Sequence, residues 1–385
     1  MPPTQTARPR RAVLFPDTER AAWLRLSLTR GIGLAGARTL LAAFGPPEDV
    51  FAADRSSLAQ VVGAAAAARL LAPDPGRERA VEQALDWADR PGHRLLSLID
   101  PDYPGPLRET ADPPILLYAR GATEVLHRPC LAIVGSRTPT AGGARTATAF
   151  ARALADSGLA IASGLARGID SAAHAGALGR AGGTIAVLGT GIDAVYPPEN
   201  RPLADAIADG GGAVLSEMPL GSGPRKSGFP RRNRVIAGLS LGVLVVEAAL
   251  RSGSLITARL AAEAGRDVFA IPGSIHSPLS RGCHLLIKQG ARLVECAQDV
   301  LSELPELPPL AGPRAGPLPP SGGAAGASAA DPDPLLALLG WDPLGIDSLV
   351  ALGAGEGRSV AARLLELELA GCVDRLADGR YQRRA

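Results

Sequence analysis

The hydrophobic and polar positions follow two periods that divide the chain into regions. Between residues 18 and 91, apolar side chains such as Leu24 and Leu40 recur at the three- and four-residue spacing of amphipathic helices. A Gly-Ile-Gly turn at 31–33 separates the first two of these helices, and a proline pair at 46–47 ends the second. The pattern therefore predicts a small N-terminal helical domain over residues 18–91.

From residue 92 to residue 303, short apolar runs of strand length alternate with helical patterns such as 144–156 and 255–264. The predicted strands are 131–135, 159–163, 184–188, 213–216, 243–246 and 268–271. This alternation is typical of an α/β domain whose parallel sheet is covered by helices on both faces. Right-handed crossovers place the carboxyl ends of the strands at one edge, where such sheets bind ligands.

The C-terminal part of the chain has a different composition and a third pattern. Residues 304–333 are rich in proline, glycine and alanine, which is typical of a linker. Within 334–385, three short helical patterns precede two strand-like runs that flank Asp378-Gly379, a strong hairpin signal. Three helices followed by a hairpin predict a winged-helix domain over 334–385.

Composition supports folded domains but leaves the ligand open. Hydrophobic residues make up 46% and charged residues 20% of the chain, so a large core is expected. The net charge of +2 neither indicates nor excludes nucleic acid, so the local distribution of charge must decide. Arginine supplies nearly all cations, and Lys226 and Lys288 are the two lysines. A lysine is therefore more informative here than an arginine.

The cysteine spacing and the hydropathy pattern predict a cytoplasmic protein without membrane association. The four cysteines are Cys130, Cys283, Cys296 and Cys372, and they form no CxxC pair. This spacing argues against a zinc ribbon or a disulfide framework and suits a reducing compartment. No run of 18 apolar residues predicts a membrane span, and the N-terminal residues lack the apolar region of a signal peptide.

Small polar and basic residues lie at the ends of the first two predicted strands of the sheet, 131–135 and 159–163. They are Gly135, Ser136 and Arg137 after the first strand, and Ser163, Gly164 and Arg167 after the second. Free backbone N–H groups at a strand-to-helix turn, with hydroxyl and guanidinium donors beside them, suit a phosphate group. The alternative is an ordinary structural turn with a surface arginine.

The segment 221–234 concentrates positive charge and contains no acidic residue. Its glycines and proline predict a loop. The candidate contacts to nucleic acid in it are Arg225, Lys226, Phe229, Arg232, Asn233 and Arg234. Cations beside an aromatic ring can hold phosphates and stack one base. Alternatively, Arg232 and Arg234 pair with Glu217 and Glu247, and the last two residues of the segment begin a core helix.

Further candidate groups follow the later strands. The residues Ser252, Gly253 and Ser254 offer another helix start with donors for phosphate. Asp170 and His174 are one helical turn apart and either form a metal or acid-base site or make only local hydrogen bonds. Glu247 is either a general base or a structural partner for an arginine.

Motifs of catalysis and of nucleotide binding are missing from the sequence. It contains no GxGxxG or GxxxxGK[ST] motif, no cluster of metal ligands, and no nucleophile with a base nearby in sequence. An edge of the sheet rich in anion donors without such groups predicts a surface that binds a polyanion. We therefore expect a binding protein and not an enzyme, with neither cofactor nor metal.

Six segments resemble motifs of the DNA-processing protein A family (DprA, also called Smf). They are IVGSR at 133–137, SGLARGID at 163–170, FPRRNRVIAGLS at 229–240, VEAALRSGSLITAR at 246–259, DVFAIPG at 267–273 and LIKQGA at 286–291. The resemblance implies an extended Rossmann-like fold that binds single-stranded DNA, with a small helical domain before it and a winged helix after it. It also implies a homodimer that protects incoming DNA and loads a RecA-type recombinase in natural transformation, with single-strand-binding protein as a further candidate partner.

The resemblance also assigns residues. Carried onto this chain, 135–137 match the phosphate-binding loop of the family, and Ser163 and Gly164 match a second loop. Arg225 or Lys226 takes the basic position of the family, and Phe229 with 232–234 matches its central motif. One departure is His284, which stands where the family has asparagine in a GxNxLI pattern, and a hydrogen bond from histidine varies with pH.

Other interpretations compete with this one. A nucleotide phosphoribohydrolase would share the sheet, but it relies on a PGGxGTxxE motif, whereas this chain has PGSI at 272–275 without a following glutamate. A regulator that binds duplex DNA through the winged helix is the other rival, although Glu366 and Glu368 outnumber Arg363 on its predicted recognition helix. The turn at 31–33 is either a phosphate-binding helix-hairpin-helix or a plain turn.

Overall fold

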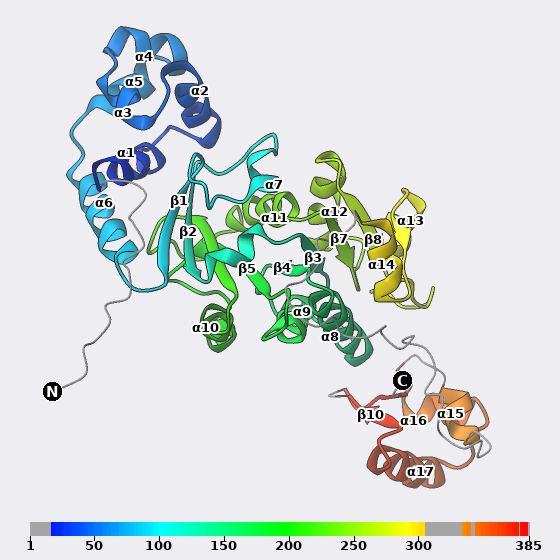
Figure 1. Ribbon diagram of the computed structural model, residues 1–385. Coiled ribbons are helices and arrows are strands. Elements are labelled where there is room, and N and C mark those ends of the chain that lie inside the picture. The colour runs from blue at the N-terminus through cyan, green and yellow to red at the C-terminus, as the bar shows by residue number, and fades with distance from the viewer. Residues whose placement is uncertain (1–16, 305–332, 340–342, 377, 384–385) are drawn as a thin grey trace, which may run out of the picture.

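A nine-stranded sheet forms the centre of the computed structural model, which describes residues 17–304, 333–339, 343–376 and 378–383 (Figure 1). Its strand order is β1-β2-β6-β5-β4-β3-β7-β8-β9. The bounds are β1 His93–Ser97, β2 Leu116–Gly121, β3 Cys130–Val134, β4 Ala160–Ser163, β5 Thr184–Gly191, β6 Ala213–Met218, β7 Gly242–Val245, β8 Asp267–Ala270 and β9 Arg292–Leu293. Strands β3 to β9 pair in parallel, whereas β1 and β2 are antiparallel additions at one edge.

Helices cover both faces of this sheet (Figure 1). On one face lie α8 Ala141–Asp156, α9 Ile169–Ala177, α10 Arg201–Asp209 and α14 Ala297–Glu303. On the other lie α7 Gly105–Arg108, α11 Gly228–Leu239, α12 Ser254–Glu263 and α13 Arg281–Lys288. Two short 3-10 turns are η1 Thr123–His127 and η2 Pro198–Asn200. Because both faces are covered, β3 and β5 are buried along their whole length, and their sequences are almost wholly apolar or glycine.

Six helices form the N-terminal part of the molecule, at one end of the sheet (Figure 1). They are α1 Asp17–Leu28, α2 Leu34–Phe44, α3 Pro47–Ala52, α4 Arg55–Val62, α5 Ala64–Leu71 and α6 Pro75–Ala88. The apolar positions at helical spacing point inward, and Leu24, Leu40 and Leu58 are completely buried. Aspartates cap α4 and α6, since Asp54 and Asp74 each accept two backbone N–H groups of the first helical turn.

The C-terminal part has its own apolar core at the opposite end of the molecule (Figure 1). It consists of α15 Pro334–Leu339, α16 Ile346–Ala351, α17 Gly357–Leu369, β10 Val373–Arg375 and β11 Tyr381–Arg383. The hairpin contacts α8: Asp374 forms an ion pair with Arg145, and the Gln382 side chain accepts a hydrogen bond of 3.2 Å from the backbone N–H of Gly142.

The structure confirms the predicted class, an α/β sheet followed by a winged helix, and adds two findings. The antiparallel strands β1 and β2 and the short parallel strand β9 were not predicted. The segment 221–234, predicted to be a loop, is helical from Gly228 onward as the start of α11. Pro230 is compatible with this because a first-turn N–H has no partner within a helix. The predicted linker 304–333 lies outside the described residues except at its two ends.

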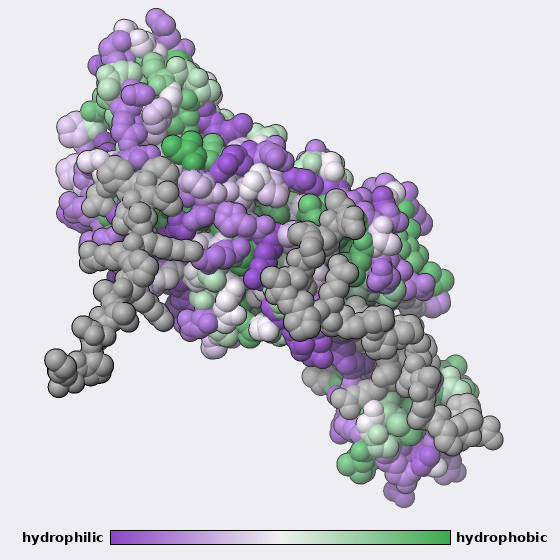
Figure 2. Space-filling model, viewed as in Figure 1, coloured by the Kyte–Doolittle hydropathy of each residue, from purple (hydrophilic) through white to green (hydrophobic). Residues whose placement is uncertain are grey.

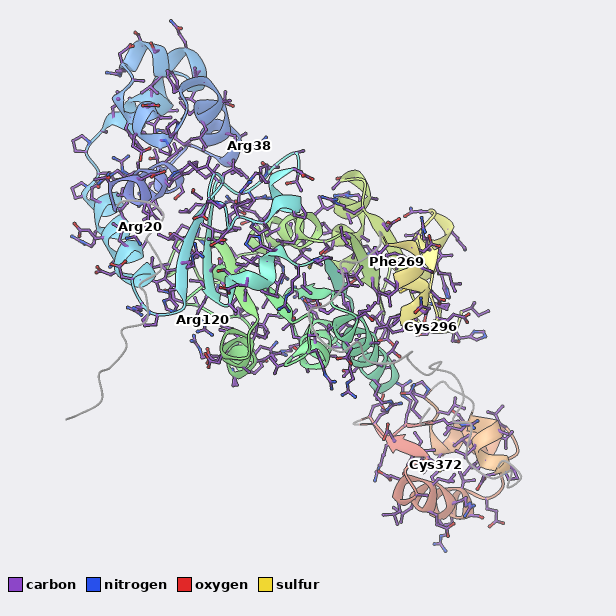
Figure 3. All side chains as sticks on the ribbon, viewed as in Figure 1. Arg20, Arg38, Arg120, Phe269, Cys296 and Cys372 are labelled. Atoms are coloured by element: carbon purple, nitrogen blue, oxygen red, sulfur yellow. The ribbon has the colours of Figure 1, made fainter. Side chains whose placement is uncertain are left out.

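The sequence also predicted cysteines without disulfide bonds and helices that do not span a membrane. All four cysteines have free thiols, and Figure 3 shows Cys296 and Cys372 in different parts of the molecule. In the described part of the chain, no helix combines the length and the apolar character needed to cross a membrane.

Candidate nucleic-acid interface

The strand order reverses beside β3, which creates a topological switch point. The chain continues from β3 to β4 on one side and later returns to place β7 on the other side. In open α/β sheets, the loops that leave the strands at such a point diverge and leave a crevice for a ligand. The loops after β3, β4 and β7, together with the last residue of β4 and the first of α12, carry nine of the fifteen predicted contacts.

A cavity of about 360 Å³ lies at this switch point. Its lining comprises Val134, Gly135, Arg137, Ala166, Asp170, Phe229, Pro230, Arg232, Asn233, Ile236, Ser252, Gly253, Ser254, Ile256 and Thr257. The structure therefore brings together eight of the predicted contacts: Gly135, Arg137, Phe229, Arg232, Asn233, Ser252, Gly253 and Ser254. The other seven, described below, lie outside this lining.

Arg137 and Phe229 stack at the cavity. The guanidinium carbon of Arg137 lies 5.4 Å from the centre of the Phe229 ring, a cation–π arrangement. Arg137 is exposed, and within the described part of the chain no carboxylate pairs with it. Its N–H groups are therefore available to an external anion, while Phe229 presents a partly exposed ring beside them.

Arg225 and Lys226 lie on the exposed loop between β6 and α11. Both side chains are exposed, and neither has an ion-pair partner among the described residues. The carbonyl group of Arg225 accepts a hydrogen bond of 3.0 Å from the N–H of Gly228, which begins α11. The two cations thus directly precede the helix that carries Phe229, and they add unpaired positive charge to the same edge of the sheet.

Arg232 is buried beneath the cavity, with 6% of its surface exposed. Its guanidinium group donates to the carbonyl oxygens of Gly164 and Val187, and to Asn233 Oδ1 at 3.0 Å. The Asp170 carboxylate provides the compensating charge and accepts the N–H groups of Gly164 and Ala166. Burial raises the pKa of Asp170, and the nearby Arg232 opposes this rise. Arg232 therefore joins the loop after β4 to α11 from inside the molecule.

Arg234 is held on the far side of α11. Its guanidinium group pairs with Glu217 at 2.5 Å and also reaches Asp112, and Arg231 pairs with the same Glu217 at 2.8 Å. The pairing of Arg234 with Glu217 matches the alternative interpretation of this segment. Asn233 stands between Arg232 and Arg234 in the sequence. Its side-chain amide donates to the Gly253 carbonyl oxygen at 3.4 Å, which joins α11 to the loop before α12.

The remaining predicted contacts shape the loops. Ser163 is buried and donates to the Ile133 carbonyl oxygen at 2.6 Å, and buried Ser136 accepts the N–H of Thr138 at 3.1 Å. Gly164 must lack a side chain, because a Cβ atom there would lie 1.6 Å from the Arg232 guanidinium. Arg167 is exposed and pairs with Glu199 at 2.5 Å.

The two acidic candidates for catalysis have structural partners. Glu247 accepts the Thr140 backbone N–H at 2.9 Å and the Thr140 hydroxyl at 2.6 Å, so it holds the N-terminus of α8. Burial raises the pKa of Glu247, and the hydrogen bonds from Thr140 oppose this. Asp170 serves the loop after β4, as described above. Neither carboxylate is positioned as a free base.

His174 is buried and hydrogen-bonds to Thr184, not to Asp170. The Thr184 hydroxyl donates to the Ile161 carbonyl oxygen, so its oxygen accepts the Nδ1–H of His174 at 2.7 Å. Burial lowers the pKa of His174 to about 3, and the Arg232 charge adds to this effect. His174 is therefore neutral and makes local hydrogen bonds, as one of the two interpretations expected. His284 donates a hydrogen bond from its Nε2–H group to the Gly273 carbonyl oxygen at 3.0 Å.

Sequence reasoning missed Tyr196, in the loop between β5 and η2. Its ring centre lies 6.0 Å from that of Phe229, and 42% of its surface is exposed. The signal was present, because the chain has four tyrosines and this one stands in a polar loop before two prolines. An aromatic ring in such a place has no evident core partner.

Comparison with known proteins identifies the family to which this sequence is similar. A family model described as "DNA recombination-mediator protein A" matches residues 94–305, more than half of the chain, and one described as "DprA winged helix domain" matches 319–379. The Protein Smf of Escherichia coli is 49% identical over 226 residues, which are 59% of this chain and 60% of that protein. The chain thus matches less than two thirds of the length of that relative.

Two solved structures are also similar. The X-ray structure of DNA processing protein A from Streptococcus pneumoniae is 40% identical with a TM-score of 0.66, covering 74% of this chain and 98% of that one. DNA processing protein A from Helicobacter pylori, whose structure describes a single-stranded DNA binding mode, is 33% identical with a TM-score of 0.50, covering 55% and 94%. On its fold and these matches, the chain belongs to the DNA-processing protein A (DprA/Smf) family.

Proposed function

We propose that this protein binds single-stranded DNA along the carboxyl edge of its sheet. The observation that carries the proposal is the stack of Arg137 on Phe229 at the mouth of the switch-point cavity. An unpaired guanidinium group can hold a backbone phosphate while the adjacent ring stacks on a base. Arg225 and Lys226 extend the positive charge along the same edge.

The lining of the cavity explains why the bound strand should be single. Base stacking on Phe229 needs an exposed base face, which a duplex covers with its neighbouring base pairs. The polar groups that line the cavity beside the ring include the Arg137 guanidinium and the Ser252 and Ser254 hydroxyl groups, which can donate to phosphate or sugar oxygens of any sequence. We therefore expect binding without strong sequence preference. The Helicobacter pylori relative is likewise described as binding single-stranded DNA.

The proposal extends to partners and location. As in the family, the protein is expected to protect incoming single strands and to load a RecA-type recombinase onto them, and we propose that it does so in the cytoplasm. We propose a homodimer that forms through the groove of about 690 Å³ between α12 and α13, where Leu250 and Leu285 are exposed. Figure 2 shows apolar side chains at that end of the sheet.

We propose a binding function without catalysis. Asp170, which lines the cavity, and Glu247, which follows β7, already accept hydrogen bonds that organise loops. On α17, Arg363 pairs with Asp333 and with Glu366, and the two glutamates balance the charges of Arg358 and Arg363, so the helix offers no net positive charge to a DNA groove. Both observations favour single-strand binding over a phosphoribohydrolase and over a duplex regulator.

The test is a salt titration of binding to a single-stranded oligonucleotide, with the full chain and the Arg137→Ala variant. The logarithm of the binding constant should fall linearly with that of the salt concentration, and the loss of one phosphate contact should reduce the slope by about 0.7. Arg152→Ala, an exposed arginine at the other end of α8, is the matched control and should leave the slope unchanged. Salt-independent binding, or equal affinity for a duplex of the same sequence, contradicts the proposal.

A further inference from the structure

We propose that Tyr196 is a second base-stacking residue, which takes the base next to the one on Phe229. This inference rests on the proposed single-strand binding and adds a residue to that site. It defines the ligand as a stretch of at least two consecutive unpaired bases, recognised by their faces and not by their edges.

The exposure of Tyr196 is unusual within this chain. The other three tyrosines, Tyr103, Tyr118 and Tyr381, are buried, with between 1% and 6% of their surface exposed, whereas Tyr196 is 42% exposed. Tyr103 also uses its hydroxyl group in a hydrogen bond of 2.8 Å to the Pro114 carbonyl oxygen. Tyr196 thus leaves much of an aromatic ring in solvent, at a cost in hydrophobic free energy that a stacked base would remove.

The position of Tyr196 continues the stack described above. Its ring is tilted by 51° to that of Phe229 at a centre-to-centre distance of 6.0 Å, and Phe229 in turn lies under Arg137. The three side chains come from the loops after β5 and β3 and from the start of α11, so they form a row along the edge of the sheet. Successive bases of a strand held at Arg137 would meet the two rings in turn.

The loop that carries Tyr196 is fixed in place before any ligand binds. The side-chain amide of Asn200 donates to the Leu165 carbonyl oxygen at 2.8 Å and to the Ser171 hydroxyl at 3.0 Å. Val195 and Pro197, the two neighbours of Tyr196, are buried. The backbone therefore pays little additional ordering entropy when the ring stacks on a base.

The charge around the loop is compatible with a phosphate backbone. Glu199 and Asp193 each lie three residues from Tyr196 in sequence, and Glu199 pairs with Arg167 at 2.5 Å. Asp193, on the other side, accepts the Gly221 backbone N–H at 2.9 Å and 3.0 Å through its two oxygens. A strand that passes Tyr196 therefore meets carboxylates whose charge is already partly compensated.

The test combines a change in the protein with a change in the DNA. The affinity of the full chain for a short oligonucleotide is measured for the unchanged protein, Tyr196→Ala and Tyr196→Phe, and then again with an oligonucleotide of the same length whose central nucleotides are abasic. Tyr196→Ala should weaken binding of the normal strand by about 5- to 150-fold, whereas Tyr196→Phe should retain it. On the abasic strand, all three proteins should bind alike.

Two controls separate the possible failures. Ile99→Ala removes another exposed apolar side chain and should leave the affinity for the normal strand and for the abasic strand unchanged. Equal melting temperatures of the variants exclude an effect through folding. If Tyr196→Ala weakens the normal and abasic strands equally, or has no effect while Arg137→Ala does, the inference is wrong and the proposed function stands. If the unchanged protein does not bind single strands, the proposed function itself fails.

Discussion

The carbonyl oxygen of Gly164 accepts a hydrogen bond from the buried guanidinium group of Arg232, and only a residue without a side chain leaves room for that group. The contact joins the loop after β4 to α11. Because α11 also carries Phe229, the position of the stacking ring depends on a charge inside the molecule. Arg232 therefore supports the interface from below, while Arg137 and Lys226 present charge to solvent.

Replacing Arg232 by alanine should destabilise the protein strongly. The change leaves the buried Asp170 carboxylate without its compensating charge and removes the guanidinium donor from the Gly164 and Val187 carbonyl oxygens. Removal of one partner from a buried charge pair costs about 3–5 kcal/mol of unfolding free energy. Urea denaturation measures this value. Arg225→Ala, at an exposed arginine, should change it by less than about 0.5 kcal/mol, and a similar small effect for Arg232→Ala would refute the supporting role.

Gly164→Ala should destabilise the protein through the same contact. A Cβ atom at this position would lie 1.6 Å from the Arg232 guanidinium, so the arginine must move away from its acceptors. Once Arg232 is already alanine, the added methyl group meets no guanidinium. The double variant should therefore be more stable than the two single effects predict, by about 1–3 kcal/mol. Additive losses in a urea-denaturation cycle would show that the two residues act independently.

His174 should make the stability of the protein depend on pH below neutrality. Its pKa is lowered to about 3 in the folded state by burial, against about 6.5 when the chain is unfolded. Between these values the unfolded chain takes up a proton that the folded chain cannot, so stability is present above pH 6.5 and is lost as the pH falls. The loss approaches about 1.4 kcal/mol for each pH unit.

The variant His174→Gln isolates this contribution, because glutamine can still donate to Thr184 but does not titrate. Urea denaturation of both proteins at several pH values gives their difference, in which the other titrating groups cancel. We expect the unchanged protein to lose stability relative to the variant as the pH falls below 6.5. If the difference in unfolding free energy between the two proteins stays constant with pH, the pKa of His174 is the same in the folded and the unfolded state, and the prediction is wrong.

The sequence was sufficient to predict the parallel strands β3 to β8 and the winged helix. It was insufficient for the strands at the two edges of the sheet, β1 and β2 at one edge and β9 at the other. The apolar runs predicted β3 to β8 because strands that are buried on both faces are almost wholly apolar. The strands β1 and β2 were missed because their sequences, HRLLS and LLYARG, mix apolar and charged residues and lie beside proline-rich turns. Such edge strands have only weak local signals, and their pairing depends on β6, far along the chain.

The candidate site was predicted at the level of loops but not at the level of single side chains. The order of strands and helices brings the loops to one edge, so Arg137 and Phe229 could be expected to approach each other. Which arginine faces solvent depends on the rotation of α11 about its axis. Arg232 points inward and Arg234 toward Glu217, whereas the local sequence treated them alike. The predictions that these two residues contact DNA remain untested.

The winged helix contacts α8 through two neighbouring pairs of residues, and this contact yields the last prediction. Asp374 and Gln382 lie opposite each other in the β10–β11 hairpin. Arg145 and Gly142, their partners, lie three residues apart and hence on the same side of α8. These two contacts, side by side on both the hairpin and the helix, hold the hairpin against α8, which begins just after the Gly135–Arg137 loop. We therefore expect the contact to fix the winged helix near the DNA-binding edge in solution.

Reversal of one charge should release this contact, and reversal of both should restore it. Arg145→Asp or Asp374→Arg alone places like charges together, and the radius of gyration from small-angle X-ray scattering should increase. The double variant recreates an ion pair with the opposite polarity and should return the radius to its original value. Arg152→Glu, on the same helix but away from the hairpin, is the control and should have no effect. Because a partly exposed ion pair contributes only about 0–1 kcal/mol, most of the effect must come from the introduced repulsion. Equal radii for all five proteins would mean that the ion pair does not hold the winged helix in place.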